Sequence, residues 1–225
     1  MRPEDDEPSG DRLRVLLVDD HPLMRQGMAA IINEEPDLTV CGEAEDSVTA
    51  LKLIGQIQPD LAIVDITLKD AYGIELVKQL KDRESHIPVL VLSMHDESMY
   101  GERAIRAGAK GYLNKQEASK KVITAIRTIL GGDIFVSDKM KAAMLQKMAG
   151  GHRPEGQAPT DVLSDRELEV FQLLGQGQTV RQIAEMLFVS PKTVEAHREH
   201  IKEKMNFKTS SELLRFAIQF TMKEG

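Results

Sequence analysis

Acidic side chains follow two apolar runs of the sequence, at the point where each predicted strand ends. Asp19 and Asp20 come directly after the run RVLLV, and Asp65 ends the run LAIVD. In open parallel sheets, ligands bind at the carboxyl ends of the strands where the strand order reverses, and in a five-stranded flavodoxin-like sheet that point lies between the first and third strands. We therefore expect the three carboxylates to share one pocket. Because like charges repel there unless a cation neutralises them, the pattern predicts a divalent ion such as Mg²⁺.

A hydroxyl and an ammonium group follow two further predicted strands. Ser93 ends the run PVLVLS, and Lys115 follows the short run GYL by two positions. Both would face the same edge of the sheet as Asp65. A carboxylate nucleophile, Mg²⁺, a hydroxyl donor and a fixed positive charge together form a site that can accept and hold a phosphoryl group. No separate general base is needed, because a carboxylate is already ionised at neutral pH.

The elements that must position these groups alternate between short β-branched runs and longer amphipathic segments. Five such repeats predict a parallel sheet with helices on both faces, an α/β fold of the flavodoxin-like kind. The predicted strands cover residues 14–18, 38–44, 61–65, 88–93 and 111–113, and the predicted helices 22–33, 46–56, 72–83, 97–107 and 116–130.

Length, composition and charge bound the organisation of the chain. With 225 residues, of which 41% are hydrophobic, two domains of ordinary size are favoured over one large domain. The boundaries that we predict are a disordered acidic tail over residues 1–12, an α/β domain over 13–131, a linker with a possible helix over 132–160, and a helical domain over 161–225.

The same composition excludes several classes of protein. The single cysteine, Cys41, cannot form an intramolecular disulfide, and no segment resembles a signal peptide or a membrane helix. We therefore expect a cytoplasmic protein with no membrane partner. The net charge of −7 argues against a broadly adhesive nucleic-acid binder, although it leaves room for a small basic surface.

The last 65 residues have the spacing of a helix-turn-helix unit. Helices are predicted over residues 164–174, 179–187, 191–206 and 211–222, and Ser164 with Glu167 forms a capping box at the first of them. Ser190 and Pro191 open the longest helix, which in a helix-turn-helix lies in the major groove of DNA. Residues 159–225 hold nine basic and ten acidic side chains, so a monomer should bind DNA weakly and a homodimer is expected.

Four segments of the first domain, taken together, resemble the motifs of a response-regulator receiver domain. These segments are VLLVDDHPLMRQG, LAIVDITLKDAYGIEL, VLVLSMHDE and AGAKGYLNK, and the resemblance spans about residues 13–130. It implies that Asp65 is the phosphoacceptor, that a histidine kinase is the phosphodonor, and that Mg²⁺ is the cofactor. By the same resemblance the metal would be held by Asp20 directly, by Asp19 largely through water, by Asp65 and by the backbone carbonyl of Thr67. The groups that would bind the phosphoryl oxygens and switch the domain are Lys115, Ser93 and Tyr112.

The C-terminal domain resembles the LuxR-type DNA-binding domain of NarL/FixJ response regulators. The matching stretch runs from LSDRELEV to KTSSELL, across essentially the whole domain. The resemblance implies contacts with the backbone of double-stranded DNA from Lys192, Thr193, Arg198, Lys202 and Lys204. It places Glu195, Ala196 and Glu199 at base-facing positions. We expect His197 to be a packing or phosphate contact rather than a metal ligand, because no cysteine or third histidine lies at zinc spacing. An alternative is that the glutamates form a solvated helix face and pair with the basic residues.

These expectations add up to a phosphorylation-controlled transcription factor rather than an enzyme. Whether phosphorylation frees the recognition helix or creates a dimer surface is left open. One rival is a Mg²⁺-dependent aspartyl-phosphate hydrolase, which needs an acid/base carboxylate two residues after Asp65, where Thr67 stands. The other is a regulator whose helical domain docks a protein instead of DNA. A salt-dependent DNA-binding assay with Arg198→Ala distinguishes the second rival.

Overall fold

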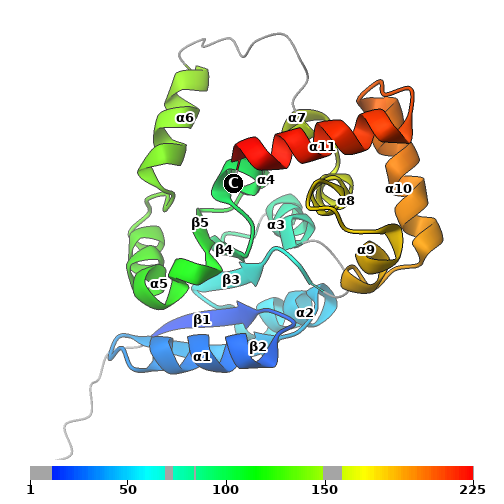
Figure 1. Cartoon of the computed structure of the whole chain (residues 1–225). Coiled ribbons are helices and arrows are strands. Elements are labelled where there is room, and N and C mark those ends of the chain that lie inside the picture. The colour runs from blue at the N-terminus through cyan, green and yellow to red at the C-terminus, as the bar shows by residue number, and fades with distance from the viewer. Residues whose placement is uncertain (1–11, 69–72, 84, 149–158, 225) are drawn as a thin grey trace, which may run out of the picture. The chain divides into compact units, whose positions relative to one another are not determined.

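The computed structural model describes residues 12–68, 73–83, 85–148 and 159–224 (Figure 1). The predicted tail of residues 1–12, apart from Arg12, and the middle of the predicted linker therefore lie outside the described residues. The chain forms two compact units. The first comprises Met1–Met94 and Ala104–Val136, and the second comprises His95–Arg103 and Ser137–Gly225.

The first unit is built on a five-stranded parallel sheet in the order β2-β1-β3-β4-β5, as predicted (Figure 1). The strands are β1 (Leu13–Val18), β2 (Leu38–Ala44), β3 (Leu61–Asp65), β4 (Val89–Ser93) and β5 (Gly111–Asn114). The helices are α1 (Pro22–Asn33), α2 (Ser47–Ile57), α3 (Gly73–Asp82), α5 (Lys115–Leu130) and the last turn of α4 (Glu97–Ala107).

Local sequence explains where these helices begin. Pro22 stands at the first turn of α1, where a missing N–H costs nothing. Asp46 caps α2 by accepting a hydrogen bond from the Thr49 backbone N–H at 2.6 Å. Asn114 caps α5 by accepting from the Gln116 N–H at 2.9 Å. The cap at Asn114 starts α5 at Lys115, so the side chain of Lys115 is fixed at the carboxyl edge of the sheet.

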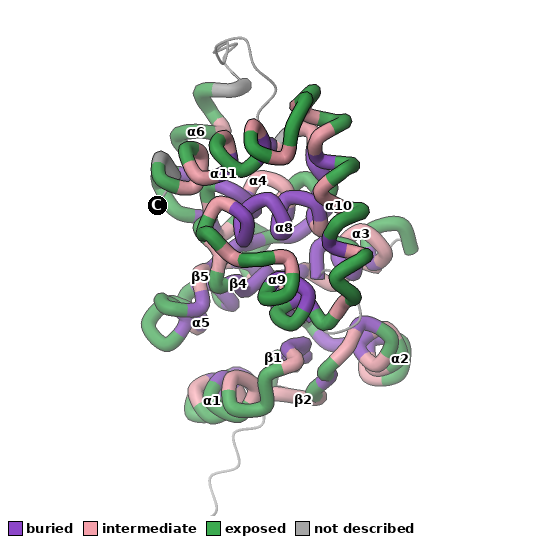
Figure 2. Tube along the Cα trace, turned by 45° about the vertical axis from the view of Figure 1, so that its right-hand side comes forward, coloured by how far each residue is buried: buried purple, intermediate pink, exposed green. Residues whose placement is uncertain are grey.

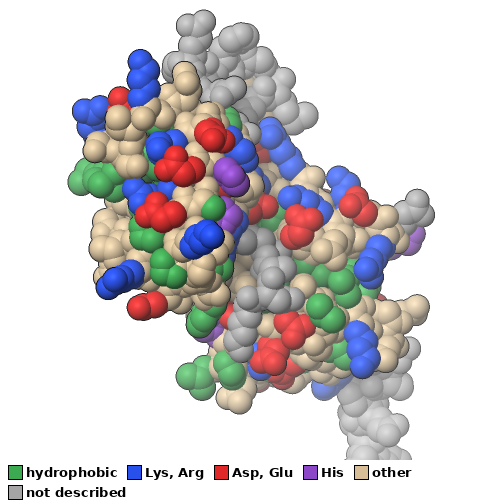
Figure 3. Space-filling view, turned by 90° about the vertical axis from the view of Figure 1, so that its right-hand side faces the viewer, with side chains coloured by type: hydrophobic (Ala, Val, Ile, Leu, Met, Phe, Trp, Pro, Cys, Tyr) green, Lys and Arg blue, Asp and Glu red, His purple; other side chains and the backbone are tan. Residues whose placement is uncertain are grey.

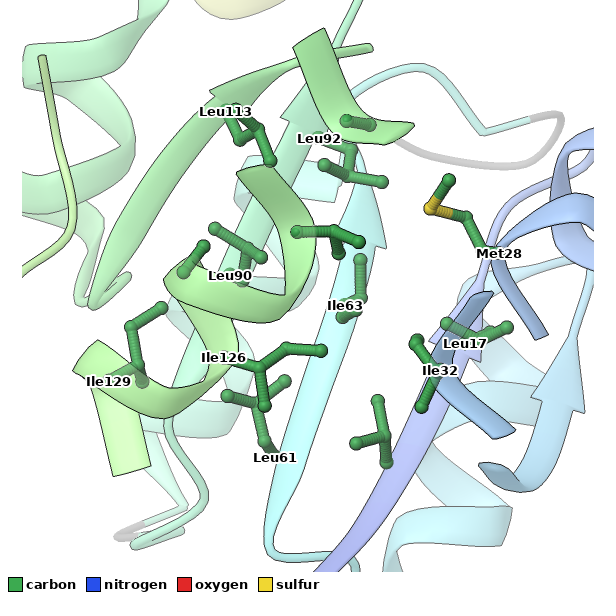
Figure 4. Packing of buried hydrophobic residues seen from close by; sticks show 14 of the residues in the cluster. Leu17, Met28, Ile32, Leu61, Ile63, Leu90, Leu92, Leu113, Ile126 and Ile129 are labelled. Atoms are coloured by element: carbon green, nitrogen blue, oxygen red, sulfur yellow. The ribbon is translucent and has the colours of Figure 1, made fainter. Parts of the chain in front are cut away.

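One face of the sheet and the helices α1 and α5 enclose the main apolar core (Figure 4). Alternate residues of the central strands supply it, such as Leu61 and Ile63 from β3, and Leu90 and Leu92 from β4. All four are at most 2% exposed. The intervening residues of these strands are buried as well, so both faces of the sheet are covered, which is typical of parallel sheets. The covered sheet gives the strand ends a rigid base.

The second unit contains α6 (Asp138–Met148) and five helices of the C-terminal domain. These are α7 (Pro159–Val162), α8 (Asp165–Gly175), α9 (Val180–Met186), α10 (Pro191–Lys204) and α11 (Ser210–Glu224). Helix α8 is the central element: it contacts α9, α10 and α11, and most of its residues are buried (Figure 2). Its Phe171 packs against Phe216 and Phe220 of α11 with ring centroids 6.1 and 5.7 Å apart.

The first turns of α4 also belong to the second unit. The Tyr100 hydroxyl donates a hydrogen bond to Gln172 Oε1 of α8 at 3.0 Å, and both side chains are buried. Arg103 forms an ion pair with Asp165 at 3.0 Å. Residues that the sequence assigns to the α/β domain are thus packed on α8.

Two details differ from the sequence-based expectations. The short helix α7 begins at Pro159, inside the stretch predicted as linker, because Pro fits a first helical turn as well as a loop. Helix α10 ends at Lys204 rather than at Asn206, whose φ of +56° is left-handed and terminates the helix. Among the described helices, none has the length and apolar composition needed to span a lipid bilayer.

Candidate functional site

The carboxylates of β1 and β3 meet at the carboxyl edge of the sheet, as the strand order predicts. Val18 pairs with Val64 in the parallel register, so Asp19, which follows β1, lies beside Asp65, the last residue of β3. One ligand atom from each of Asp19, Asp20, His21 and Asp65 can be chosen so that all lie within 4.8 Å of one another. Asp19 is 5% and Asp65 3% exposed. Three carboxylates are therefore held together in surroundings poor in water.

Lys115 is the cation that this group of carboxylates already contacts. Its Nζ lies 2.6 Å from Asp65 Oδ2 and 2.7 Å from Asp19 Oδ2. Desolvation, the largest single effect, lowers the pKa of this buried ammonium, but the attraction of Asp65 and Asp19 outweighs it and the net change is upward. Lys115 therefore stays protonated, as a phosphoryl-binding cation must.

Asp65 has a raised pKa. Burial is the main cause, Lys115 opposes it, Asp19 adds to it, and the pKa moves from 3.8 to about 6. The carboxylate is thus still mostly ionised at neutral pH, and it is more basic than an ordinary aspartate. Its Oδ1 accepts a hydrogen bond from the Thr67 N–H at 3.3 Å. These features suit a nucleophile whose other oxygen faces an ammonium group.

Ser93 and Tyr112 come from the next two strands of the sheet. Ser93 ends β4 and is opposite Asn114 in the parallel register. Asn114 is the residue before Lys115. Ser93 is fully buried and Tyr112 is 2% exposed, so the tyrosine ring lies inside the fold. Both residues thus occupy positions consistent with the predicted switch role.

The donor set at this edge fits a divalent cation. Asp19 Oδ2 and Asp20 Oδ1 are buried, and the groups nearest to them are Lys115 Nζ and His21 Nδ1, each at 2.7 Å. Lys115 supplies one positive charge to three carboxylates, so a divalent cation would balance the negative charge that remains. Oxygen ligands are also what Mg²⁺ prefers.

Two residues that support the site were not predicted from the sequence. Gly73 opens α3, and a Cβ at this position would lie 1.9 Å from the backbone oxygen of Asp65. Arg25 of α1 binds the Asp19 carbonyl oxygen through Nη1 and Glu43 through Nε. A glycine at the start of a predicted helix was the only signal for the close approach at Gly73, and the sequence carried none for Arg25.

The C-terminal unit has the local structure of a helix-turn-helix. Thr179 and Gln182 form a capping box at α9, and Phe188 has a left-handed φ of +52° in the turn that follows. Ser190 then caps α10 by accepting from the Thr193 N–H at 3.1 Å. Val194 and Ile201, seven residues apart, are buried on one side of α10. Helix α10 therefore presents its opposite side outward.

The side of α10 that faces away from Val194 and Ile201 carries charges of both signs. Its exposed residues include Lys192, Glu195, Ala196 and Glu199, which recur at helical spacing. Arg198 contacts Glu195 at 2.8 Å, and Lys202 contacts Glu199 at 2.8 Å. On the face of the molecule in Figure 3, acidic and basic side chains also lie next to one another. The pairing alternative for the glutamates is thus present in the structure.

Three other predicted DNA-binding residues are half-buried or already paired within the protein. His197 is half-buried; burial is the main cause that lowers its pKa, and Arg166 adds to the effect. Thr193 is half-buried, and its hydroxyl lies 2.8 Å from that of Ser190. Lys204 is exposed but forms an ion pair with the buried Glu167 at 2.6 Å.

Comparisons with known proteins agree with this geometry. Residues 15–127 match the family described as "Response regulator receiver domain", and residues 161–217 match "Bacterial regulatory proteins, luxR family". The oxygen regulatory protein NreC of Staphylococcus carnosus is 33% identical over 211 residues, which are 92% of this chain and 97% of NreC. The chain is a two-component response regulator of the LuxR family.

Solved structures of other response regulators are also similar to this chain. The response regulator ChrA of a heme-sensing two-component system is 32% identical, with a TM-score of 0.51, over 93% of this chain and 98% of ChrA. A LuxR-family response regulator from Aurantimonas sp. SI85-9A1 is 30% identical, with a TM-score of 0.57, over 61% of this chain and 99% of that one. The regulator thus has a receiver domain and a LuxR-type DNA-binding domain that serve transcription control.

Proposed function

We propose that Asp65 accepts a phosphoryl group from a histidine kinase. A carboxylate oxygen of Asp65 attacks the phosphorus of a phosphohistidine, the P–N bond breaks, and the imidazole leaves with the bonding electron pair and takes up a proton. The observation that supports this most strongly is the contact of one buried ammonium, Lys115, with both Asp65 and Asp19. The Lys115 charge is positioned to compensate the negative charge that a phosphoryl group brings.

The other residues of the site have separate roles in this proposal. Asp20, Asp19, Asp65 and the Thr67 carbonyl would hold Mg²⁺, which supplies positive charge to the phosphoryl oxygens when bound. The Ser93 hydroxyl would donate a hydrogen bond to a phosphoryl oxygen, and Tyr112 would follow the movement of Ser93. A hydrolase is disfavoured because Thr67 stands where an acid/base carboxylate is needed.

Intact-mass spectrometry tests the phosphorylation proposal. The full-length protein is incubated with a small phosphodonor and Mg²⁺, with and without a chelator. Wild type should gain one phosphoryl group only without chelator, and Asp65→Asn should gain none. Asp60→Asn is a control, because Asp60 is an exposed carboxylate of the same domain. Equal labelling of Asp65→Asn and wild type would refute the assignment.

We also propose that α10 binds the major groove of double-stranded DNA and that the regulator binds as a homodimer. Arg198 supports this, because its side chain is 20% exposed on this helix and its guanidinium lies beside the exposed Glu195. A guanidinium group matches the bidentate hydrogen-bonding geometry of a DNA phosphate. Lys192, for which the described part shows no ion pair, is exposed at the start of the same helix.

A DNA-binding titration at several salt concentrations tests this second proposal. The affinity for DNA should fall as the salt concentration rises. Arg198→Ala should weaken binding and should reduce the steepness of log affinity against log salt concentration by about one. Lys120→Ala removes an exposed charge of the receiver domain and should leave the slope unchanged. Binding that is indifferent to salt and to Arg198→Ala would instead favour a protein partner for this domain.

A further inference from the structure

The chain leaves the last helix of the first unit through a short segment that pairs with the edge of the sheet. Gly111 of β5 and Phe135 form an isolated parallel bridge. The Phe135 N–H donates to the Lys110 carbonyl oxygen, and the Tyr112 N–H donates to the Phe135 carbonyl oxygen, both at 2.9 Å. We call residues 134–136 the strap. The strap lies on the outer edge of β5, the last strand of the sheet, and binds the backbone of the proposed switch residue Tyr112.

Local sequence turns the chain back from α5 to this edge. Gly132 has a left-handed φ of +95°, and the Asp133 N–H donates to the Thr128 carbonyl oxygen at 3.1 Å, so α5 ends in a Schellman turn. Gly111 admits the strap on the side of the sheet, because a Cβ there would lie 3.0 Å from the Phe135 carbonyl oxygen. A glycine inside a strand is typical of such a close approach of another backbone segment. The two glycines therefore allow the strap to lie against β5.

The strap is held by a small number of contacts. Val136 is 6% exposed and Phe135 is half-buried against the main apolar core, whereas Ile134 is 46% exposed. The bridge at Phe135 is isolated, so its two hydrogen bonds are not supported by a longer ladder. Segments with few buried apolar contacts and few hydrogen bonds open at a low cost in free energy. The strap can therefore alternate between an attached and a detached state while the sheet stays folded.

The strap is also the last part of the first unit. The chain passes from the first unit to the second between Val136 and Ser137. When the strap is detached, the connection between the units begins at Gly132 and gains up to about 17 Å of extended chain. A longer connection gives the C-terminal domain a wider range of positions in which to meet a second copy on DNA. The state of the strap therefore sets the reach of the C-terminal domain.

We propose that the strap couples phosphorylation of Asp65 to DNA binding. In the proposed function Tyr112 follows the movement of Ser93, and a displacement of β5 at Tyr112 acts on the hydrogen bond that joins it to the strap. Phosphorylation detaches the strap, and the longer connection then releases the C-terminal domain for pairing on DNA. The strap is thus a two-state element whose equilibrium the phosphoryl group shifts. This inference rests on the proposed function and adds the route by which the signal leaves the receiver domain.

Hydrogen exchange with mass spectrometry of the full-length protein tests the state of the strap. Wild type in Mg²⁺ is compared before and after treatment with acetyl phosphate, and the intact mass verifies that a phosphoryl group has been added. The amides of Phe135 and Tyr112 should exchange at least about tenfold faster after phosphorylation, whereas the inner turns of α5 should not change. Asp65→Asn, treated in the same way, is the control and should show unchanged exchange.

A DNA-binding titration tests whether the strap controls DNA binding. Phe135→Ala removes the side chain that packs the strap against the core, so without phosphorylation it should bind non-specific double-stranded DNA at least about fivefold more tightly than wild type. Phosphorylation should then change the affinity of Phe135→Ala by less than about twofold. Ile134→Ala is the matched control, because the neighbouring Ile134 is exposed, and it should behave as wild type. Both variants should gain the phosphoryl group as wild type does.

The outcomes separate failure of this inference from failure of the proposed function. If wild type gains the phosphoryl group but the strap amides exchange as before, the inference is wrong and the phosphorylation of Asp65 stands. If exchange rises but Phe135→Ala binds DNA as wild type does, the strap does not control DNA binding and the inference is equally wrong. If wild type gains no phosphoryl group, the proposed function is wrong and the inference falls with it. Circular dichroism verifies the folding of each variant, and the exchange measurement on wild type needs no variant.

Discussion

Replacing Asp65 by Asn is expected to stabilise the metal-free receiver domain at neutral pH. Burial is the main reason that the pKa of Asp65 rises from 3.8 to about 6, and this rise corresponds to about 3 kcal/mol of unfavourable free energy when the carboxylate is ionised. Because Asp65 is 3% exposed, solvent screens little of that cost. This figure already includes the attraction of Lys115, but Asn leaves the buried Lys115 ammonium with Asp19 alone, so we expect a net gain of about 1 to 2 kcal/mol.

The gain should depend on pH in a defined direction. The folded state binds the Asp65 proton more tightly than the unfolded chain does, so the cost is absent below the unfolded pKa of 3.8 and complete above the folded pKa of about 6. The stability of wild type therefore falls relative to that of Asp65→Asn as pH rises through this window. Near pH 4 the folded Asp65 is protonated and neutral like Asn, so the stabilities of the two proteins should differ little.

Urea unfolding in the presence of a chelator measures this difference. Pulsed hydrogen exchange with mass spectrometry of β1 and β3 peptides reports on the receiver domain alone, which matters because the chain has no tryptophan. Asp133→Asn, a change at an exposed carboxylate of the same domain, should stay within about 0.5 kcal/mol of wild type. Excess Mg²⁺ should then stabilise wild type more than Asp65→Asn. A variant that is less stable than wild type near pH 7, or a difference that does not change with pH, would refute the electrostatic reasoning.

Two further substitutions test the support of the site and the charge of the recognition helix. Gly73→Ala places a methyl group against the Asp65 backbone oxygen, so urea unfolding should show a free energy of unfolding lower by about 1 to 3 kcal/mol. Gly27→Ala, in open space on α1, should raise the free energy of unfolding by up to about 1 kcal/mol. Equal effects would contradict the close approach at Gly73. Glu195→Gln releases Arg198 and removes a charge that repels phosphate, so titrations with non-specific DNA should show about two- to fivefold tighter binding. Unchanged affinity would mean that this ion pair does not limit DNA binding.

Much of the fold could be predicted because local sequence and sheet topology act together. Pro22 sets the start of α1, and the alternation of buried strands and amphipathic helices sets the order of the sheet. The gathering of Asp19, Asp20 and Asp65 follows from that order alone. These residues could be assigned from the sequence because the carboxyl ends of the first and third strands are neighbours in every sheet of this topology.

What could not be predicted depends on contacts between residues far apart in the sequence. The ion pair of Lys204 with Glu167 joins residues 37 positions apart, and it gives a structural partner to a lysine that was assigned to DNA. The hydrogen bond from Tyr100 to Gln172 spans 72 positions. Neither pair has a local signature, because each partner alone is typical of a solvated helix surface.

The most direct measurement of the central assignment locates the phosphoryl group on the chain. Borohydride converts an aspartyl phosphate into homoserine, which peptide mass spectrometry then identifies by position. After treatment with a small phosphodonor and Mg²⁺, the account predicts homoserine at Asp65 and nowhere else. Homoserine at Asp19 or Asp20, or a labelled protein in which Asp65 remains unmodified, would contradict it.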